Sequence, residues 1–259
     1  MNLVRPAAVA GQFYPGNPET LRRKIESMLD AVSVPDSDEL ARAYVVPHAG
    51  HRYSGPVAAH VYARLRAHAA KVKRIVLIGP SHFVPLQGLA GSPATGWRTP
   101  LGDVSTPAAA GIATDAAVHE REHSLEVQLP FLQVCLGPDV AVTPIAVGKS
   151  TIAEAATGIN GLVDADTVLL CSTDLSHYHD EATAKRLDRA TADAVLEAEP
   201  RRIKTSDACG VFALRGTVAW AAHHGLHARE LKLGTSADTI GPPERVVGYP
   251  AFCFGPPRN

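Results

Sequence analysis

Three histidines of this sequence, His48, His82 and His177, each follow a short apolar run after a few residues. Runs rich in valine, isoleucine and leucine are typical of strands that are buried on both faces of a parallel sheet. The carboxyl ends of parallel strands meet at one edge of the sheet, where ligands bind in open α/β folds. A single histidine in such a loop is more often a bystander. Three histidines that each follow an apolar run predict that their imidazoles meet at one site.

Two further residues are candidates for the same edge. Asp174 precedes His177 by three residues. A carboxylate there can accept an imidazole hydrogen bond, fix the tautomer and raise the basicity of the ring. Cys209 follows two candidate helix caps, Ser206 and Asp207. At a helix N-terminus the dipole lowers a thiol pKa and favours the thiolate. Each has a plainer interpretation, a helix cap for Asp174 and a small buried hydrophobe for Cys209.

The chemistry of these side chains favours a metal site. Two neutral imidazoles and one thiolate can hold a first-row metal ion and leave coordination positions open. We therefore predict that His48, His82 and Cys209 bind iron or copper, with zinc as an alternative. His177 and Asp174 then remain for acid–base work. The rival interpretation is a metal-free nucleophilic triad of Cys209, His177 and Asp174. It ranks second because it gives His48 and His82 no role.

A cluster of acids and a histidine adds a third group of candidates. Glu122 and Glu126 are four residues apart, with His123 between them, and on a helix the two acids would share one face. The order is not H-E-x-x-H, so the zinc-peptidase mechanism is not predicted. A solvated surface explains the acids equally well. We keep His123 as a candidate catalytic residue, and leave open whether His51 or the two acids join the site.

The elements that must position these residues alternate between strand and helix. Residues 83–107 are expected to be irregular, and a loop of that length is usually functional. Pro144 indicates an edge strand or a break, and Thr20 is a candidate helix cap. We expect strands near residues 43–46, 74–78, 140–147, 168–172, 231–235 and 246–254, helices near 20–31, 57–70, 107–112, 151–163, 181–197 and 211–224, and short helical pieces around Pro130. This alternation predicts an α/β fold, a three-layer α/β/α sandwich with a mostly parallel central sheet, as one domain over residues 1–259.

Composition narrows the class of protein. The 259 residues are 46% hydrophobic and 20% charged, with a formal net charge of −1. That near-neutral balance gives no electrostatic reason to expect nucleic acid or an anionic membrane as partner. The four cysteines show no CxxC spacing and no dense framework, which is typical of a reducing compartment. No apolar run has the length of a membrane span or a signal core. We expect a cytoplasmic protein.

Six motifs in order resemble the Memo family, called AmmeMemoRadiSam system protein B in bacteria and archaea. The motifs cover nearly the whole chain and are Ala10-Gly11-Gln12-Phe13-Tyr14-Pro15, Pro47-His48-Ala49-Gly50, Gly79-Pro80-Ser81-His82, Glu122-His123-Ser124-Leu125-Glu126, Ser172-Thr173-Asp174-Leu175-Ser176-His177 and Ala208-Cys209-Gly210. The resemblance implies a fold like that of the class III, LigB-type extradiol dioxygenases. These are non-haem iron enzymes that cleave catechol rings and hold their metal with two histidines and a glutamate.

The resemblance also implies roles for individual residues. His48 and His82 match the two metal-binding histidines, and Cys209 takes the place of the carboxylate. His177 matches the acid–base histidine, and Asp174 precedes it as in Memo relatives. The corresponding residues of Memo proteins are implicated in binding iron or copper. A thiolate is softer than a carboxylate and can itself be oxidised, so dioxygenase activity does not follow from the match. His51 stands where relatives often carry tyrosine.

At the level of function, the resemblance implies a metal-dependent redox role. The system name suggests a radical-SAM protein and an AMMECR-type protein as partners, with an unidentified small molecule or protein as substrate. A homodimer is a further expectation. The alternative is a metal-binding or peptide-binding module without turnover.

Overall fold

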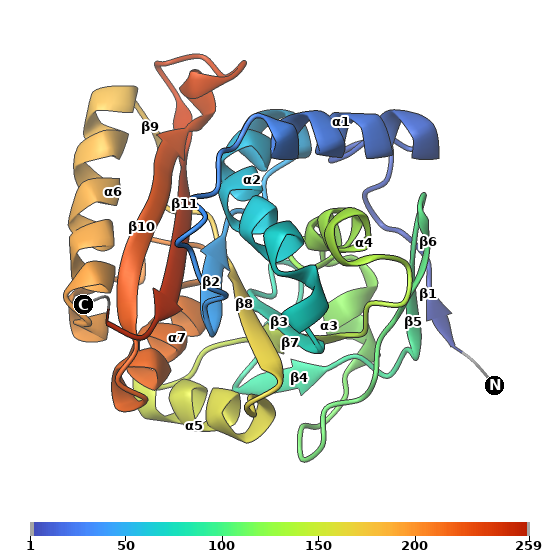
Figure 1. Ribbon diagram of the computed structural model, residues 1–259. Helices are drawn as coiled ribbons and strands as arrows, with labels where there is room; N and C mark the ends of the chain where they lie inside the picture. Colours follow the sequence, from blue (N-terminus) through green and yellow to red (C-terminus); the bar gives the residue numbers. More distant parts are fainter. Residues whose placement is uncertain (1–2, 258–259) are drawn as a thin grey trace.

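A central mixed β-sheet organises the chain in the computed structural model, which describes residues 3–257 (Figure 1). Its main strands are β2 (Ala43–Val46), β3 (Arg74–Gly79), β4 (Leu89–Gly91), β7 (Val142–Val147), β8 (Thr167–Ser172), β10 (His227–Thr235) and β11 (Val246–Gly255). They lie in the order β10-β11-β2-β8-β3-β7-β4. The neighbours β2, β8, β3 and β7 are parallel. Antiparallel strands flank this group on both sides. The carboxyl ends of β2, β8 and β3 therefore lie side by side, as the three apolar runs predict.

Helices cover both faces of this sheet. Alternate residues of each strand enter two separate cores. Tyr44 and Leu77 pack with one set of helices, and Val45 and Val76 pack with the other. The first layer holds α1 (Pro18–Asp30), α2 (His51–Ala67) and α4 (Leu129–Leu136), and the second holds α5 (Ile152–Leu162), α6 (Glu181–Leu196) and α7 (Val211–His223). The expected three-layer α/β/α arrangement is confirmed. Residues 1–2 and 258–259 of the expected single domain lie outside the described residues.

Several short elements complete the fold. The strands β1 (Val4–Arg5), β5 (Gly96–Thr99) and β6 (Gly102–Ser105) form a small separate sheet, and β9 (His177–His179) pairs with β11. There is also a short helix, α3 (Ala116–Glu120). Short 3-10 helices span Ala69–Lys71, Glu126–Gln128, Pro200–Arg202 and Ser236–Asp238. Residues 83–107 were expected to be irregular, and they instead contain β4, β5 and β6. Strands of three or four residues are too short to show a hydrophobic period.

Some expected boundaries are wrong. The helix α2 begins at His51 rather than near residue 57, although Gly55 and Pro56 indicate a loop. A β-carbon at Gly55 would lie 2.5 Å from Sδ of Met28, so close packing on α1 explains the glycine and overrides its low helix propensity. The helix expected at 107–112 is absent, and Gly111 there has a φ of +77°. Asn17, not Thr20, caps α1, because Pro18 occupies its first turn.

Two further expectations are corrected in the sheet and at α7. Pro144 lies inside β7, between β3 and β4, rather than in an edge strand. The strand β4 pairs only with residues 145–147, so Pro144 lies just beyond the end of that pairing. The helix α7 has Gly210 as its cap, not Ser206 or Asp207. Among residues 3–257, none of the helices combines the length and apolar character that a membrane crossing needs.

Candidate metal site

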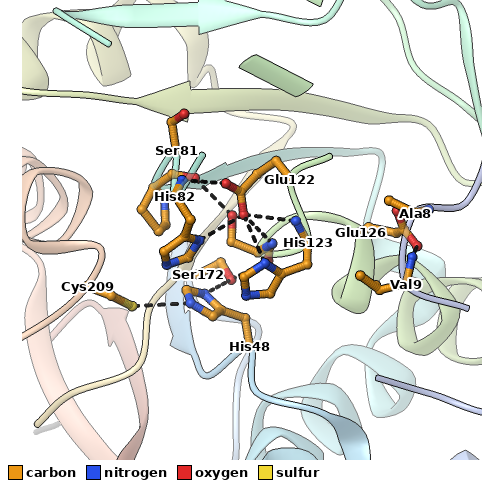
Figure 2. Close-up of polar contacts among 12 residues, drawn as sticks. Ala8, Val9, His48, Ser81, His82, Glu122, His123, Glu126, Ser172 and Cys209 are labelled. Atoms are coloured by element: carbon orange, nitrogen blue, oxygen red, sulfur yellow. Dashed lines mark hydrogen bonds and ion pairs between the residues drawn. The ribbon is translucent and has the colours of Figure 1, made fainter. Parts of the chain in front are cut away.

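Three histidines lie together at the carboxyl edge of the parallel strands (Figure 2). His48 follows β2, His82 follows β3, and His123 follows α3. One ligand atom of each ring lies within 4.8 Å of the other two. The rings of His82 and His123 stack with centroids 4.7 Å apart, and the ring of His48 stands nearly perpendicular to both. Two nitrogens bound to one ion lie at most about 4.2 Å apart. A small closure would therefore bring all three to one metal.

Ser172 fixes the orientation and tautomer of His48. Its hydroxyl donates to the carbonyl of Ser124 at 2.7 Å and accepts from the Nε2 amide of Gln128 at 2.9 Å. The same Oγ lies 3.0 Å from Nδ1 of His48. Because the single proton of Ser172 is already donated, Nδ1 must carry the proton in this contact. The Nε2 atom of His48 then carries no proton, and this is the form that binds metals.

Glu122 likewise fixes the orientation of His82 through its Nδ1 atom. Its Oε1 lies 2.9 Å from Nδ1 of His82, and its Oε2 accepts the backbone N–H of His82 at 2.6 Å. Burial alone would raise the pKa of Glu122, but these hydrogen bonds and the nearby imidazole outweigh it and lower the pKa to about 2. A carboxylate that accepts from Nδ1 leaves Nε2 as the ligand atom. Burial lowers the pKa of His123 to about 4, so that ring is neutral at pH 7.

Glu126 lies away from the histidines and beside Ala8 and Val9 (Figure 2). It accepts hydrogen bonds from the N–H groups of Ala8 and Val9 and from the hydroxyl of Tyr14. It also pairs with Arg5 at 2.6 Å. These contacts fix the N-terminal loop against the sheet edge.

The expectation that the two acids share a helix face is wrong. The helix α3 ends at Glu120, and a 3-10 turn begins only at Glu126, so Glu122 and Glu126 point to different partners. Both side chains are 0% exposed, which also excludes the solvated-surface interpretation. In the loop that Glu126 holds, the ring of Phe13 lies 4.7 Å from that of His123.

Cys209 lies next to His48. Its Sγ is 3.2 Å from Nε2 of His48 and 3.3 Å from the backbone nitrogen of Asp174. Such an N···S separation fits two ligands of one ion, so Cys209 stays a predicted ligand. The three donor atoms that lie within 4.8 Å of one another nevertheless belong to His48, His82 and His123. The expected direction of the thiol pKa is wrong. Burial, followed by the charge of Asp174, raises the pKa of Cys209 to about 12.

His177 and Asp174 do not form the expected hydrogen bond. The Nδ1 atom of His177 donates instead to the carbonyl of Leu175 at 2.7 Å. Asp174 accepts the backbone N–H of His48 at 2.7 Å, and burial raises the pKa of its carboxyl to about 7. Asp174 therefore holds the strand end that carries His48. The imidazole beside Cys209 is that of His48 rather than His177, so the alternative triad of Cys209, His177 and Asp174 is not assembled.

These residues line one cavity of about 680 Å³. Its wall includes the four histidines His48, His82, His123 and His177, together with Asp174, Cys209 and the aromatic rings of Phe13, Tyr53, Tyr178 and Tyr249. His51 lines a different cavity. Its side chain lies between Tyr14 and Phe131, with Nε2 2.8 Å from the carbonyl of Val127. His51 therefore does not join the cluster of three.

Comparison with known sequences identifies the family of this chain. The sequence model of a family described as "Memo-like protein" matches residues 5–253. The chain belongs to the Memo family. A "MEMO1 family protein" of Methanococcoides burtonii is 37% identical over 96% of this chain and 99% of its own length. One of Aeropyrum pernix is also 37% identical, over 96% of this chain and 98% of its own. One of Methanopyrus kandleri is 34% identical, over the same shares.

All six Memo motifs contribute to the site or its support. The aromatic loop supplies Phe13, and four of the other motifs supply one imidazole each. Sequence reasoning missed Ser172 and Gln128, which act through hydrogen bonds on His48. The signal for Ser172 was present in the sequence, because it is a polar residue at the buried end of an apolar strand. Gln128 offered no such signal, since its partners Tyr62 and Ser172 lie far away in the chain.

Proposed function

We propose that this Memo protein binds iron or copper, or alternatively zinc, at the sheet edge, and that its role is a metal-dependent redox reaction. The observation that carries the proposal is the cluster of His48, His82 and His123, with donor atoms within 4.8 Å of one another. Hydrogen bonds to Nδ1 leave Nε2 of His48 and of His82 available. A bound ion would supply Lewis acidity and one-electron chemistry. The set of neutral nitrogens with an adjacent thiol suits these metals.

The ligand set proposed is His48, His82 and a third donor. Cys209 is the donor that the family resemblance implies, and His123 is the donor that the geometry adds. Cys209 contacts His48 directly, whereas His123 stacks on His82. Their relative contributions are therefore a matter for measurement.

His177 is proposed to move a proton in the cavity. Its Nδ1 is held by the carbonyl of Leu175, so Nε2 is the atom that can give or take a proton. Its ring is only partly buried, and it lines the same cavity as the ligand candidates. The family resemblance implies a fold like that of the extradiol dioxygenases, so a ring-cleaving or related oxidation is the reaction class to screen first.

Metal content tests the proposal directly. Protein purified with and without oxygen is analysed for iron, copper and zinc, as wild type and as Cys209→Ser, His123→Ala and His82→Ala. The exposed His223 supplies the control His223→Ala. We expect His82→Ala to lose metal and His223→Ala to keep it. Retention of the metal by Cys209→Ser would leave His123 as the third ligand. Metal retained by all four variants would contradict the site.

The role of His177 needs a separate pair of measurements. In His177→Ala we expect metal content to be unchanged and oxygen uptake or turnover to be lost. Complete loss of metal would make His177 a ligand and refute the acid–base role. Full activity with metal retained would refute it as well.

A module without turnover is the second candidate, binding a metal ion or a peptide. The exposed rings of Phe83 and Tyr178 favour it, because Tyr178 lines the cavity and the ring of Phe83 lies 6.0 Å from that of His123. Metal binding without oxygen uptake under any substrate screen would support this candidate. Family membership also leads us to propose a radical-SAM protein and an AMMECR-type protein as partners, and a homodimer. Co-purification and solution mass measurements test them.

A further inference from the structure

The charge of the cavity wall is the observation from which this inference starts. Among the described residues that line the cavity, Arg245 is the only arginine or lysine. The carboxylate in the same wall is Asp174, which is 4% exposed and bonded to the backbone of His48. Within residues 3–257, no ion pair of Arg245 is found. The cavity therefore presents one cation that makes no ion pair with a described acid.

Arg245 is exposed, and its guanidinium lies over an aromatic ring. Its Cζ lies 4.4 Å from the ring centroid of Tyr178. Its backbone N–H closes a turn onto the carbonyl of Pro242 at 3.2 Å. A guanidinium that stacks on an aromatic face keeps the N–H groups at its edge free to donate in the plane. Those donors match the two oxygens of a carboxylate.

Tyr178 adds a second, independent observation. Its φ is +65°, in the left-handed region, and its side chain is 63% exposed. A non-glycine residue in that region is strained by about 1 kcal/mol or more. In this conformation the Tyr178 ring lies beside the cavity and under the guanidinium of Arg245, although the ring gains little burial there. Residues with such backbone strain cluster at functional sites.

We propose that Arg245 binds the carboxylate of the molecule that occupies this cavity, and that this molecule is a small carboxylic acid with an apolar body. The body would lie among the rings of Phe13, Tyr53 and Tyr249, which line the same space. One unpaired cation matches a singly charged carboxylate better than a doubly charged phosphate. This inference rests on the proposed function for the identity of the cavity as a substrate site, and Arg245 becomes its specificity-determining residue.

The test compares benzoate with benzamide, which has the same shape and no charge. Binding is measured by ligand-observed NMR on the protein as purified and again after metal removal by a chelator. Wild type is expected to bind benzoate more tightly than benzamide. Arg245→Gln should weaken benzoate binding about tenfold, the effect of one charge-assisted hydrogen bond, and leave benzamide unchanged. Arg245→Lys should keep a preference for benzoate.

Arg121 provides the matched control. Its Cζ lies 5.1 Å from the ring of exposed Phe83, and it is outside the set of residues that line the cavity. Arg121→Gln should bind both probes like wild type. Equal benzoate affinity in wild type and Arg245→Gln would overturn the proposal, as would a wild type that binds neither probe or prefers benzamide. Because the metal-free arm does not depend on the ion, and metal content is measured separately, failure of this proposal is distinct from failure of the proposed function.

Discussion

Oε1 of Glu122 lies 2.9 Å from Nδ1 of His82, and the same oxygen accepts the backbone N–H groups of His123 and Ser124. One buried carboxylate thus holds the ring of one candidate ligand and the backbone of another. The two rings that it connects are stacked, with 17° between their planes. Their relative position is therefore set by Glu122 before any metal binds.

Glu122→Gln should lower metal affinity about 10- to 100-fold. An amide has one oxygen acceptor in place of two and carries no charge, so it cannot serve His82, His123 and Ser124 in the same way. Affinity is measured by competition with a chelator of known strength. Glu126→Gln is the control, because Glu126 is equally buried but contacts the N-terminal loop. That variant should lose stability and keep its metal affinity. Similar affinities in the two variants would refute the assignment.

Removing the metal should lower the melting temperature of wild type. A ligand that binds only the folded state adds stability that grows with its free concentration, about 2.7 kcal/mol at 100 times Kd. The melting temperature is recorded with and without a chelator, for wild type and for His48→Ala. The chelator should have little effect on the variant, because a principal ligand is missing. An equal chelator effect in both proteins would show that the stabilising ion binds elsewhere.

His51 should make stability depend on pH in mildly acidic solution. Burial lowers the pKa of His51 to about 4, whereas the unfolded value is about 6.5. The unfolded chain therefore binds the proton first, and stability falls as pH decreases from about 6.5 to about 4. From pH 7 to pH 5 the expected loss is about 2 kcal/mol. Urea unfolding of metal-free wild type and His51→Phe at both pH values checks this. The variant should lose about 2 kcal/mol less, and an identical loss would contradict a buried neutral His51.

Gly248→Ala should destabilise the fold and disturb the loop before His177. An added β-carbon would lie 1.9 Å from Oδ2 of Asp188, whose Oδ1 accepts the N–H of Ser176. Displacing this buried carboxylate should lower the free energy of unfolding by about 1–3 kcal/mol. The control is Gly161→Ala in α5, where nothing lies within 4 Å of the added carbon. It should stabilise the protein by about 0.5–1 kcal/mol. Urea unfolding measures the free energy of unfolding of both variants. Equal changes in the two would show that Asp188 leaves room for a β-carbon at residue 248.

The strands that carry the site were predictable, and the contacts between distant residues were not. An apolar run followed by a histidine is a local signal, and it correctly placed His48, His82 and His177 in the wall of one cavity. The cluster of donor atoms nevertheless contains His123 rather than His177. The start of α2 could not be read locally, because Gly55 and Pro56 indicate a loop and only the packing on Met28 shows otherwise.

The electrostatics of the site depended on burial, which the sequence does not give. A helix N-terminus lowers a thiol pKa, yet Cys209 lies before the cap of α7 and is enclosed beside Asp174, so its pKa rises. The acids of the 122–126 motif look like a solvated pair, yet each is fully buried with its own partners. Neither outcome could be obtained without knowing which distant segments cover these side chains.

The strand β11 is the last strand among the described residues, and it lies between β10 and β2. During synthesis β2 is made early, yet it cannot gain this neighbour until residues 246–255 have been made. Contacts between such distant segments slow folding, and an open strand edge invites pairing with other chains. The nascent protein therefore passes through a stage in which the edge of β2, the strand that leads into His48, is exposed. Completion of this side of the sheet therefore depends on the late pairing of β11 with β2.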